Sequence, residues 1–206
     1  MGLPADSVKR GADVAAVLLS LPVTLPLGAV IALAVAVDSR GPVLFRHRRY
    51  GRGGRRFGLV KFRTMRHGSH EAMLDGTRPG VQHAWEWAEP LKQADDPRVT
   101  RVGRFLRRSS LDELPQLWNV LRGEMSLVGP RPIPLSERRI YGKGFGVYCR
   151  VRPGLTGLWQ VSGRSDLPYA ERVRLDTAYV RGRSLRNDGQ LLLRTVPAVL
   201  RRRGAY

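Results

Sequence analysis

The pattern of hydrophobic residues is dominated by one long apolar run near the N-terminus. No charged residue occurs from Val14 to Val37. About 20 apolar residues in a helix are enough to cross the hydrocarbon core of a bilayer, so this run is long enough to enter a membrane. Pro22 and Pro26 lie in its middle, where each removes a helical hydrogen bond and bends the axis. The run therefore predicts a membrane helix with a break near Pro22.

Both flanks of this run are basic. Lys9 and Arg10 precede it, and a series of arginines that begins with Arg40 follows it. Because flanks rich in Lys and Arg stay on the cytoplasmic side, a helix that turns back at Pro22 satisfies both flanks at once. We therefore predict a re-entrant membrane segment over residues 1–40. A straight span and a buried helix of a soluble protein remain alternatives, and the basic stretch that follows disfavours a cleavable signal peptide.

Alternation with a period of two predicts a β-hairpin after this segment. Strand-like runs cover Val43–Arg48 and Phe57–Arg63, and the Gly- and Arg-rich stretch Gly51–Gly54 provides the turn between them. The alternation places Lys61 and Arg63 on the same face of the second strand. These two cations therefore point together, either towards solvent or towards an anion.

Residues 66–95 are polar, contain Pro and Gly, and lack periodicity. This composition predicts a long loop, or a short helix, that acts as a lid. Trp85 and Trp87 are expected either at a lipid interface or in the core. The segment His67–Glu71 offers two histidines and a glutamate, but a metal site there is disfavoured because the sequence shows no further ligand nearby.

Helical spacing marks three further segments. Arg101–Arg108 combines apolar residues with arginines and predicts an amphipathic cationic helix. Apolar residues recur at helical spacing over Leu111–Leu121. Leu175–Leu200 predicts a long helix that ends in a basic tail.

Clusters of Gly and Pro predict rigid turns at Gly129–Pro132 and at Arg152–Gly154. The elements together predict an α+β fold. In this fold the re-entrant helix precedes a small cytoplasmic, membrane-associated domain of α/β type over residues 41–206. That domain carries amphipathic interfacial helices and a short β-hairpin.

Composition adds a strong preference for anions. The chain has 206 residues, a formal net charge of +19 and 42% hydrophobic residues, so it can build a core and favours anionic partners. Its single cysteine, Cys149, excludes an intramolecular disulfide and a cysteine zinc site. A nucleic-acid-binding module fits the charge but is disfavoured by the long uncharged run. A non-catalytic scaffold with a basic face that binds anionic lipid remains an alternative.

Two adjacent carboxylates, Asp112 and Glu113, are the candidates for chemistry. With Ser110, Glu113 also matches a capping box, which is an ordinary structural arrangement at a helix start. Pro115 is poorly suited to a regular helix, so the pair is expected on a distorted first turn. Nearby arginines, among them Arg107, are expected to lower the pKa of a carboxylate and keep it ionised. An aspartate can attack phosphorus, and a second carboxylate can hold a divalent cation, so the pair favours phosphoryl transfer.

Several sequence blocks carry a resemblance to a known family. They are Lys61–Met65, Asp95–Arg98, Leu106–Leu121, Met125–Pro132, Pro153–Gln160, Ser162–Arg164 and Gly204–Tyr206. Together they resemble the bacterial sugar transferase family, the monotopic polyprenyl-phosphate phosphoglycosyl transferases, in their minimal catalytic form. The resemblance covers nearly the whole chain with the blocks in the expected order.

The resemblance implies transfer of a sugar 1-phosphate from a UDP-sugar to polyprenyl phosphate, usually undecaprenyl phosphate, with release of UMP. It implies a bacterial inner-membrane enzyme that faces the cytoplasm and acts in glycoconjugate or exopolysaccharide synthesis. Asp112 would be the nucleophile that forms a covalent phosphosugar intermediate, and Glu113 the carboxylate that binds Mg²⁺. Membrane lipids are expected partners, nucleic acid is not, and formation of a homodimer is left open.

The same resemblance assigns substrate contacts. Phosphate contacts would come from Lys61, Arg107 and Arg131. Arg63, Gln160 and Arg164 stand in the matching blocks and are further substrate-binding candidates. His47 departs from the family pattern, in which glutamine is expected at that position. The identity of the sugar does not follow from residue type and spacing.

Overall fold

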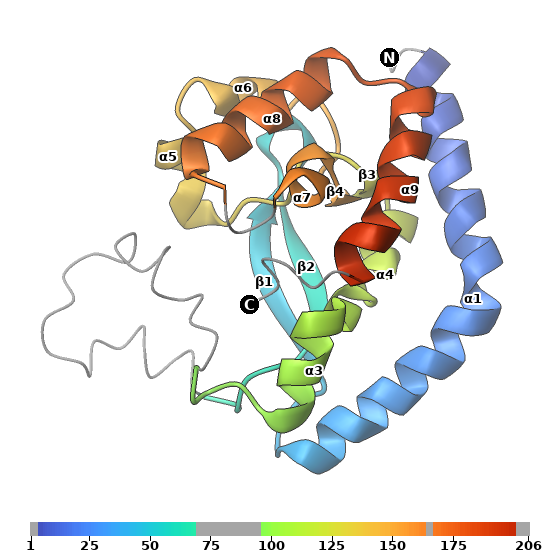
Figure 1. The fold of residues 1–206 in the computed structure, drawn as a ribbon, viewed down its shortest axis with the longest axis vertical. Helices are drawn as coiled ribbons and strands as arrows, with labels where there is room; N and C mark the ends of the chain where they lie inside the picture. Colours follow the sequence, from blue (N-terminus) through green and yellow to red (C-terminus); the bar gives the residue numbers. More distant parts are fainter. Residues whose placement is uncertain (1–3, 69–95, 164–166, 201–206) are drawn as a thin grey trace, which may run out of the picture.

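The computed structural model describes residues 4–68, 96–163 and 167–200. A long helix, α1 (Pro4–Asp38), lies along one side of a small mixed domain (Figure 1). Residues 69–95 of the predicted lid segment, with Trp85, Trp87, His70 and Glu71, lie outside the described residues, and so does Arg164. The described part confirms the α+β class: helices surround two small two-stranded sheets.

The first sheet is the predicted hairpin. Strands β1 (Leu44–Tyr50) and β2 (Arg56–Phe62) pair antiparallel, and the 3₁₀ turn η1 (Arg52–Gly54) connects them. Gly53 and Gly54 have positive φ angles of 68° and 72°, a backbone conformation that glycine adopts without steric cost. The Gly-rich turn therefore forms where the sequence places it.

The remaining elements wrap around this hairpin. The described elements after the hairpin are α3 (Arg101–Ser109), the 3₁₀ turn η3 (Leu111–Glu113), α4 (Gln116–Leu121), β3 (Ser126–Val128), η4 (Leu135–Glu137), α5 (Arg138–Tyr141), α6 (Gly144–Tyr148), β4 (Gly154–Thr156), α7 (Leu158–Ser162), α8 (Tyr169–Arg181) and α9 (Leu185–Leu200). Strands β3 and β4 pair in parallel and form the second sheet, which the sequence pattern does not predict.

The predicted C-terminal helix is wrong in one respect. In place of one helix over Leu175–Leu200, the chain forms α8 and α9 with a break between Arg181 and Leu185. The Ser184 hydroxyl accepts a hydrogen bond from the backbone N–H of Asn187 at 3.1 Å, which caps the start of α9. The helix therefore restarts at a capping serine rather than continuing.

Helix α1 is continuous through its two prolines, where the sequence predicts a break. Figure 1 shows that the helix bends in its middle portion, and its helical assignment runs without interruption through Pro22 and Pro26. Near the bend, the hydroxyls of Ser20 and Thr24 donate to the backbone carbonyls of Val17 and Ser20. Each proline removes one helical hydrogen bond, to the carbonyl four residues earlier, so it can bend a helix without interrupting it.

The two halves of α1 pack against two different hydrophobic clusters of the domain. Val17 packs with Leu59, Val120 and Met125. Ile31 and Val35 pack with Phe62 and Leu106 in a second cluster. Between these anchors the helix exposes apolar side chains, and by length and composition it could cross a membrane.

Polar contacts fix both ends of α1 to the domain. Near its start, Lys9 Nζ lies 2.6 Å from Asp188 Oδ2, and Asp13 Oδ2 accepts a hydrogen bond of 2.7 Å from the Ser126 hydroxyl. At its end, Asp38 Oδ2 accepts from the backbone N–H of Val102 at 3.1 Å. The two ends of the helix are thus held by the same domain.

Candidate active site

The carboxylate pair lies on a tight turn between two helices. Helix α3 ends at Ser110, which is the only non-glycine residue in the described ranges with a positive φ (58°). This left-handed conformation costs a non-glycine residue roughly 1–2 kcal/mol. The chain then turns into η3, which carries Asp112 and Glu113. The pair therefore lies on a 3₁₀ turn, in agreement with the distorted first turn predicted from Pro115. Strain of this kind occurs preferentially at functional sites.

The capping box suggested by Ser110 and Glu113 does not form. Ser110 makes no side-chain cap hydrogen bond, and Glu113 Oε1 instead lies 2.6 Å from Lys61 Nζ. Lys61 Nζ also lies 3.5 Å from Asp112 Oδ2. One lysine from strand β2 therefore bridges both carboxylates.

The hydrogen bonds of Asn119 set the distance between β2 and this turn. Its Oδ1 accepts from the Val60 backbone N–H at 3.0 Å, and its Nδ2 donates to the Gly58 carbonyl at 2.8 Å. Asn119 is buried on α4, directly after η3 in the chain. The same side chain that pairs with β2 thereby holds Lys61 opposite Asp112.

Burial raises the pKa of the Asp112 carboxyl. Lys61 and Arg107 act in the opposite direction, and the negative charge of Glu113 adds to the increase. The sequence predicts a lowered pKa because it shows the arginines but not the burial. Only 8% of the residue remains exposed, so loss of hydration outweighs the neighbouring cations. A poorly hydrated carboxylate is a stronger nucleophile once it is ionised.

Arg107 reaches the site from α3. Its Nε donates to the Thr64 hydroxyl at 2.9 Å, and burial lowers the pKa of its guanidinium. Helix α3 approaches the segment just after β2 closely because Gly103 has no side chain: a Cβ there would lie 2.1 Å from the Thr64 carbonyl oxygen. Arg107 follows one turn later and lines the same cavity as Asp112.

Arg131 comes from the turn after β3. Its Nη1 lies 3.8 Å from Glu113 Oε1, and its guanidinium lies 5.7 Å from the ring centre of Trp159. The predicted turns at Gly129 and Gly154 cross so closely that a Cβ on Gly154 would lie 2.0 Å from the Gly129 nitrogen. This close crossing fixes the start of the segment that carries Arg131.

Gln160 faces the cavity, whereas the guanidinium of Arg63 binds backbone carbonyls. Gln160 lines the cavity, and its buried Oε1 has no hydrogen-bond partner among the described residues. Arg63 borders the cavity, but its guanidinium donates to the carbonyls of Val35, Ser39 and Pro42. These carbonyl groups lie at the end of α1 and just after it. The guanidinium of Arg63 therefore already has partners within the protein, and its role in substrate binding stays a prediction.

Three residues of the site were not identified from the sequence. Arg49 lines the cavity, and burial together with the charge of Arg131 lowers its pKa to about 10. Trp159 lies against the guanidinium groups of both Arg131 and Arg172. Asp176 is buried near Arg131 with Tyr141 as hydrogen-bond donor, and burial raises its pKa to about 7. Alternation along β1 could have indicated Arg49, because it shares its strand face with His47, another cavity residue.

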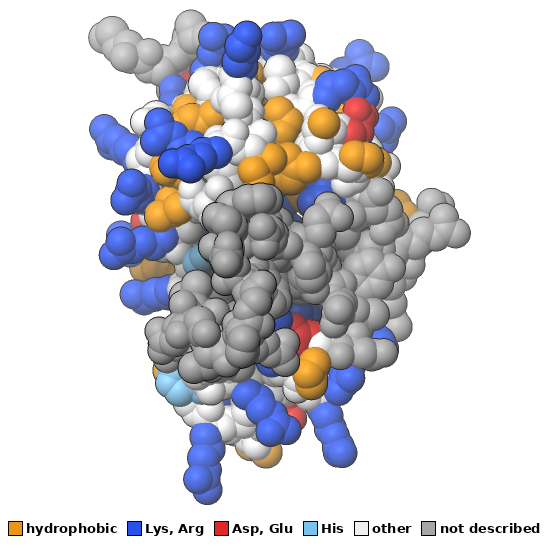
Figure 2. All heavy atoms as spheres, turned by 90° about the vertical axis from the view of Figure 1, so that its left-hand side faces the viewer, with side chains coloured by type: hydrophobic (Ala, Val, Ile, Leu, Met, Phe, Trp, Pro, Cys, Tyr) orange, Lys and Arg blue, Asp and Glu red, His pale blue; other side chains and the backbone are white. Residues whose placement is uncertain are grey.

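The cavity that contains Asp112, Glu113, Lys61, Arg107 and Arg131 has a volume of about 890 Å³. Such a volume suits a medium-sized ligand. Figure 2 views the molecule from the left-hand side of Figure 1, where Lys and Arg side chains are spread over the described surface and acidic ones are few. The setting therefore favours a ligand with several negative charges.

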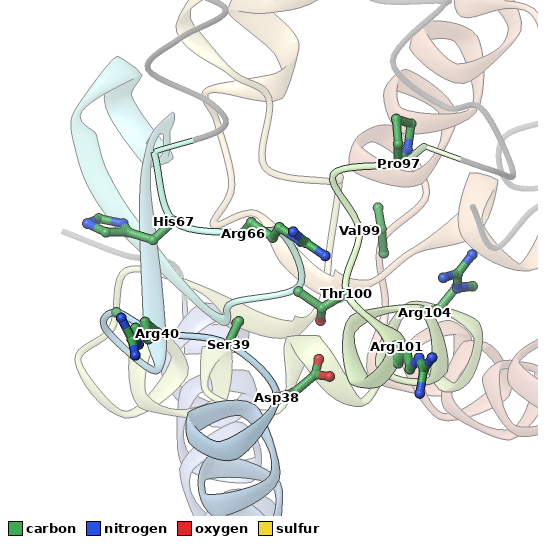
Figure 3. A pocket seen from close by; sticks show the side chains of 11 residues that line it. Asp38, Ser39, Arg40, Arg66, His67, Pro97, Val99, Thr100, Arg101 and Arg104 are labelled. Atoms are coloured by element: carbon green, nitrogen blue, oxygen red, sulfur yellow. The ribbon is translucent and has the colours of Figure 1, made fainter.

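A second cavity of about 890 Å³ lies where α1 ends and α3 begins (Figure 3). Its lining includes Arg40, Arg66, Arg101 and Arg104, and Asp38 is the one acidic residue among its described lining residues. It is suited to anions. Asp112 and Glu113 line the other cavity, which is therefore the candidate site of chemistry.

Comparison with known proteins identifies similar chains. The family model described as bacterial sugar transferase matches residues 4–202. The chain is 46% identical over 198 residues to the exopolysaccharide production protein ExoY of Rhizobium meliloti, covering 96% of this chain and 88% of that protein. It is 45% identical over 199 residues to a UDP-galactose-lipid carrier transferase of Erwinia amylovora, covering 97% of this chain but only 42% of the relative. It is also 44% identical to a UDP-glucose:undecaprenyl-phosphate glucose-1-phosphate transferase of Caulobacter vibrioides, covering 98% of this chain and 73% of that protein.

Proposed function

Since this chain belongs to the bacterial sugar transferase family, we propose that it transfers a sugar 1-phosphate from a UDP-sugar to a polyprenyl phosphate and releases UMP. The observation that carries the proposal is the arrangement of Asp112 and Glu113. The pair lies on a strained turn, is bridged by Lys61, and lines a cavity that also contains Arg107 and Arg131. The names of the Erwinia and Caulobacter relatives support a UDP-sugar donor and a lipid acceptor.

The geometry supports a two-step transfer. In the first step, an Asp112 carboxylate oxygen attacks the phosphorus that carries the sugar. The bond from that phosphorus to the bridging oxygen breaks, and UMP leaves with the electron pair. In the second step, a phosphate oxygen of the lipid attacks the same phosphorus, and the bond to Asp112 breaks to regenerate the carboxylate. Lys61, Arg107 and Arg131 offset the negative charge that accumulates on the phosphate oxygens.

The carboxylate pair also fits Mg²⁺ that arrives with a substrate. Mg²⁺ in phosphoryl-transfer sites is usually held by one or two carboxylates together with substrate phosphates. The described residues contain no cluster of three or more side chains suited to a resident metal. The oxygens of Glu113, with Asp112 beside it, are the protein groups that would hold the ion, which would neutralise phosphate charge when bound.

A panel of UDP-sugars tests this proposal. Purified protein should release UMP and form a sugar-pyrophosphate lipid with at least one of them, and UDP-galactose and UDP-glucose are the first to try. The alternative is a non-catalytic scaffold, which the arginine-lined cavity between α1 and α3 favours. Binding of anionic vesicles without UMP release from any donor would support the scaffold and contradict the enzyme.

We also propose that α1 enters the membrane and returns to the same side. A crossing helix carries its two ends to opposite sides of a hydrocarbon core of about 30 Å. Both ends of α1 contact one domain, through Lys9 and Asp188 at the start and Asp38 and Val102 at the end. The exposed apolar side chains between these ends, such as Leu19 (81% exposed), would then contact lipid.

Cysteine accessibility tests this topology. In a Cys149→Ser background, cysteines introduced at positions 3 and 40 should both react with a membrane-impermeant reagent only after the cells are opened. Replacement of Pro22 and Pro26 by leucine should favour a full span, because it restores helical hydrogen bonding. If one of the two positions is labelled in intact cells of the parent protein, α1 crosses the membrane and the proposal is wrong.

Arg131→Lys should lower turnover by about 10- to 100-fold. The substitution keeps one positive charge but loses the planar group that binds phosphate through two hydrogen bonds and stacks on Trp159. Steady-state UMP release, with circular dichroism to verify the fold, measures the effect. Arg139→Lys on α5, which is exposed, is the matched control and should leave turnover unchanged. Full activity of Arg131→Lys would contradict phosphate binding by the Arg131 guanidinium and would leave this residue with only a structural role in its turn.

A further inference from the structure

The cavity that contains Asp112 has walls of two kinds. One wall is cationic and includes Lys61, Arg107 and Arg131. The other is apolar: Leu114 and Leu117 come from the segment that follows the carboxylates, and Leu192 and Val199 come from α9. A nucleotide sugar is polar along its whole length, so contact with the apolar wall would contribute little to its binding.

The apolar wall reaches the membrane helix. A Cβ placed on Gly28 of α1 would lie 3.9 Å from Leu114 Cδ2. Leu111 and Leu114 also pack against the cluster that contains Ile31 and Val35. Leu114, which directly follows the carboxylate pair, therefore lies against α1, and Leu111, which precedes the pair, packs against the apolar cluster to which α1 contributes.

Helix α9 provides the other side of this wall. Leu192 is 41% exposed and Val199 is half-buried, and both line the cavity. Their neighbours Leu193 and Val196 are exposed by 76% and 60% and are absent from the cavity lining. Figure 1 shows α9 and α1 on the same, right-hand side of the molecule, and Lys9 of α1 pairs with Asp188 near the start of α9.

We propose that the hydrocarbon chain of the lipid phosphate enters the cavity between α9 and the η3–α4 segment. Its first isoprene units lie against Leu114, Leu117, Leu192 and Val199, and its phosphate reaches the cations beside Asp112. The inference rests on the proposed transfer reaction and names the path of its acceptor. Removal of CH₂ groups from water is favourable, so a lipid chain favours a route lined by these side chains over one through the charged rim.

The test compares neighbouring leucines on α9. Leu192→Asn places an amide in the proposed path, and Leu193→Asn makes the same change one residue along, about 100° around the helix. KM is measured for a long-chain polyprenyl phosphate and for a five-carbon isoprenyl phosphate, with a saturating donor. Leu192→Asn should raise KM for the long-chain acceptor by about five- to tenfold and change KM for the short one by less than about twofold. Val199→Asn should behave in the same way, and Leu193→Asn should match the parent protein.

The release of UMP before any acceptor is added distinguishes a failure of the proposed reaction from a failure of the proposed acceptor path. Parent protein that releases no UMP would contradict the proposed reaction itself. If UMP release is intact and Leu192→Asn and Val199→Asn leave KM for the long-chain acceptor unchanged, the acceptor path is wrong. Equal effects of Leu192→Asn and Leu193→Asn would also overturn it, because they would indicate a general loss of membrane contact.

Discussion

Asp112→Asn should abolish sugar-phosphate transfer and at the same time make the protein more stable. The amide keeps the size of the side chain but cannot attack phosphorus, so turnover should fall by at least about 10³-fold. UMP release from a UDP-sugar measures this loss. Glu113→Gln is the comparison: it should slow the reaction and weaken its dependence on Mg²⁺ while leaving the nucleophile in place. Substantial turnover by Asp112→Asn would leave this residue as a base or a metal ligand in a direct transfer.

The gain in stability follows from the direction of the pKa shift. Burial raises the pKa of Asp112 in the folded protein. Its contribution to stability is therefore present below the ordinary pKa of an aspartate and is lost as pH rises through the raised pKa. At neutral pH the ionised carboxylate destabilises the fold, and a neutral amide removes that cost. Thermal unfolding at pH 7.5 should show a higher Tm for Asp112→Asn, and a lower Tm would show that the carboxylate is well compensated by Lys61.

Lys61→Met should have the second-largest effect. Lys61 lies 2.6 Å from Glu113 Oε1 and 3.5 Å from Asp112 Oδ2, so its removal leaves two adjacent carboxylates without their shared cation. We expect turnover to fall by about 10²- to 10³-fold, because a group that offsets phosphate charge is lost as well. The pKa of Asp112 should rise further, since Lys61 lowers it. The acidic limb of the pH–rate profile should therefore move to higher pH.

Two variants control this experiment. Lys61→Arg keeps the charge and should retain the acidic limb near its original position. Lys143→Met makes the same substitution at an exposed lysine before α6 and should leave both turnover and the pH profile unchanged. An unshifted acidic limb in Lys61→Met would show that Lys61 does not control the ionisation of Asp112.

Local patterns predicted the elements that depend on local physics. The hairpin follows from alternation and a Gly-rich turn, and α3 follows from its apolar and cationic periodicity. The carboxylate pair could be placed on a distorted turn because Pro115 cannot donate a helical hydrogen bond. Each of these features is decided by residues within a few positions of one another.

Features that depend on distant contacts were not predictable in the same way. Alternation predicted Arg63 on the same strand face as Lys61, yet β2 ends at Phe62 and the guanidinium of Arg63 donates to carbonyls at the end of α1. The pKa of Asp112 is set by burial that only the assembled domain creates. The parallel pairing of β3 with β4 joins three-residue strands that are too short to show a pattern. Trp159 enters the site for the same reason, because Arg131, against which it lies, is remote in sequence.

The most direct test of the covalent mechanism uses the enzyme and a UDP-sugar donor with no lipid phosphate. A covalent intermediate on Asp112 predicts a burst of UMP that reaches at most one equivalent per active site. It also predicts a phosphosugar mass adduct on the peptide that contains Asp112, which Asp112→Asn should lack. UMP that appears only after lipid phosphate is added, with no adduct on that peptide, would contradict the account.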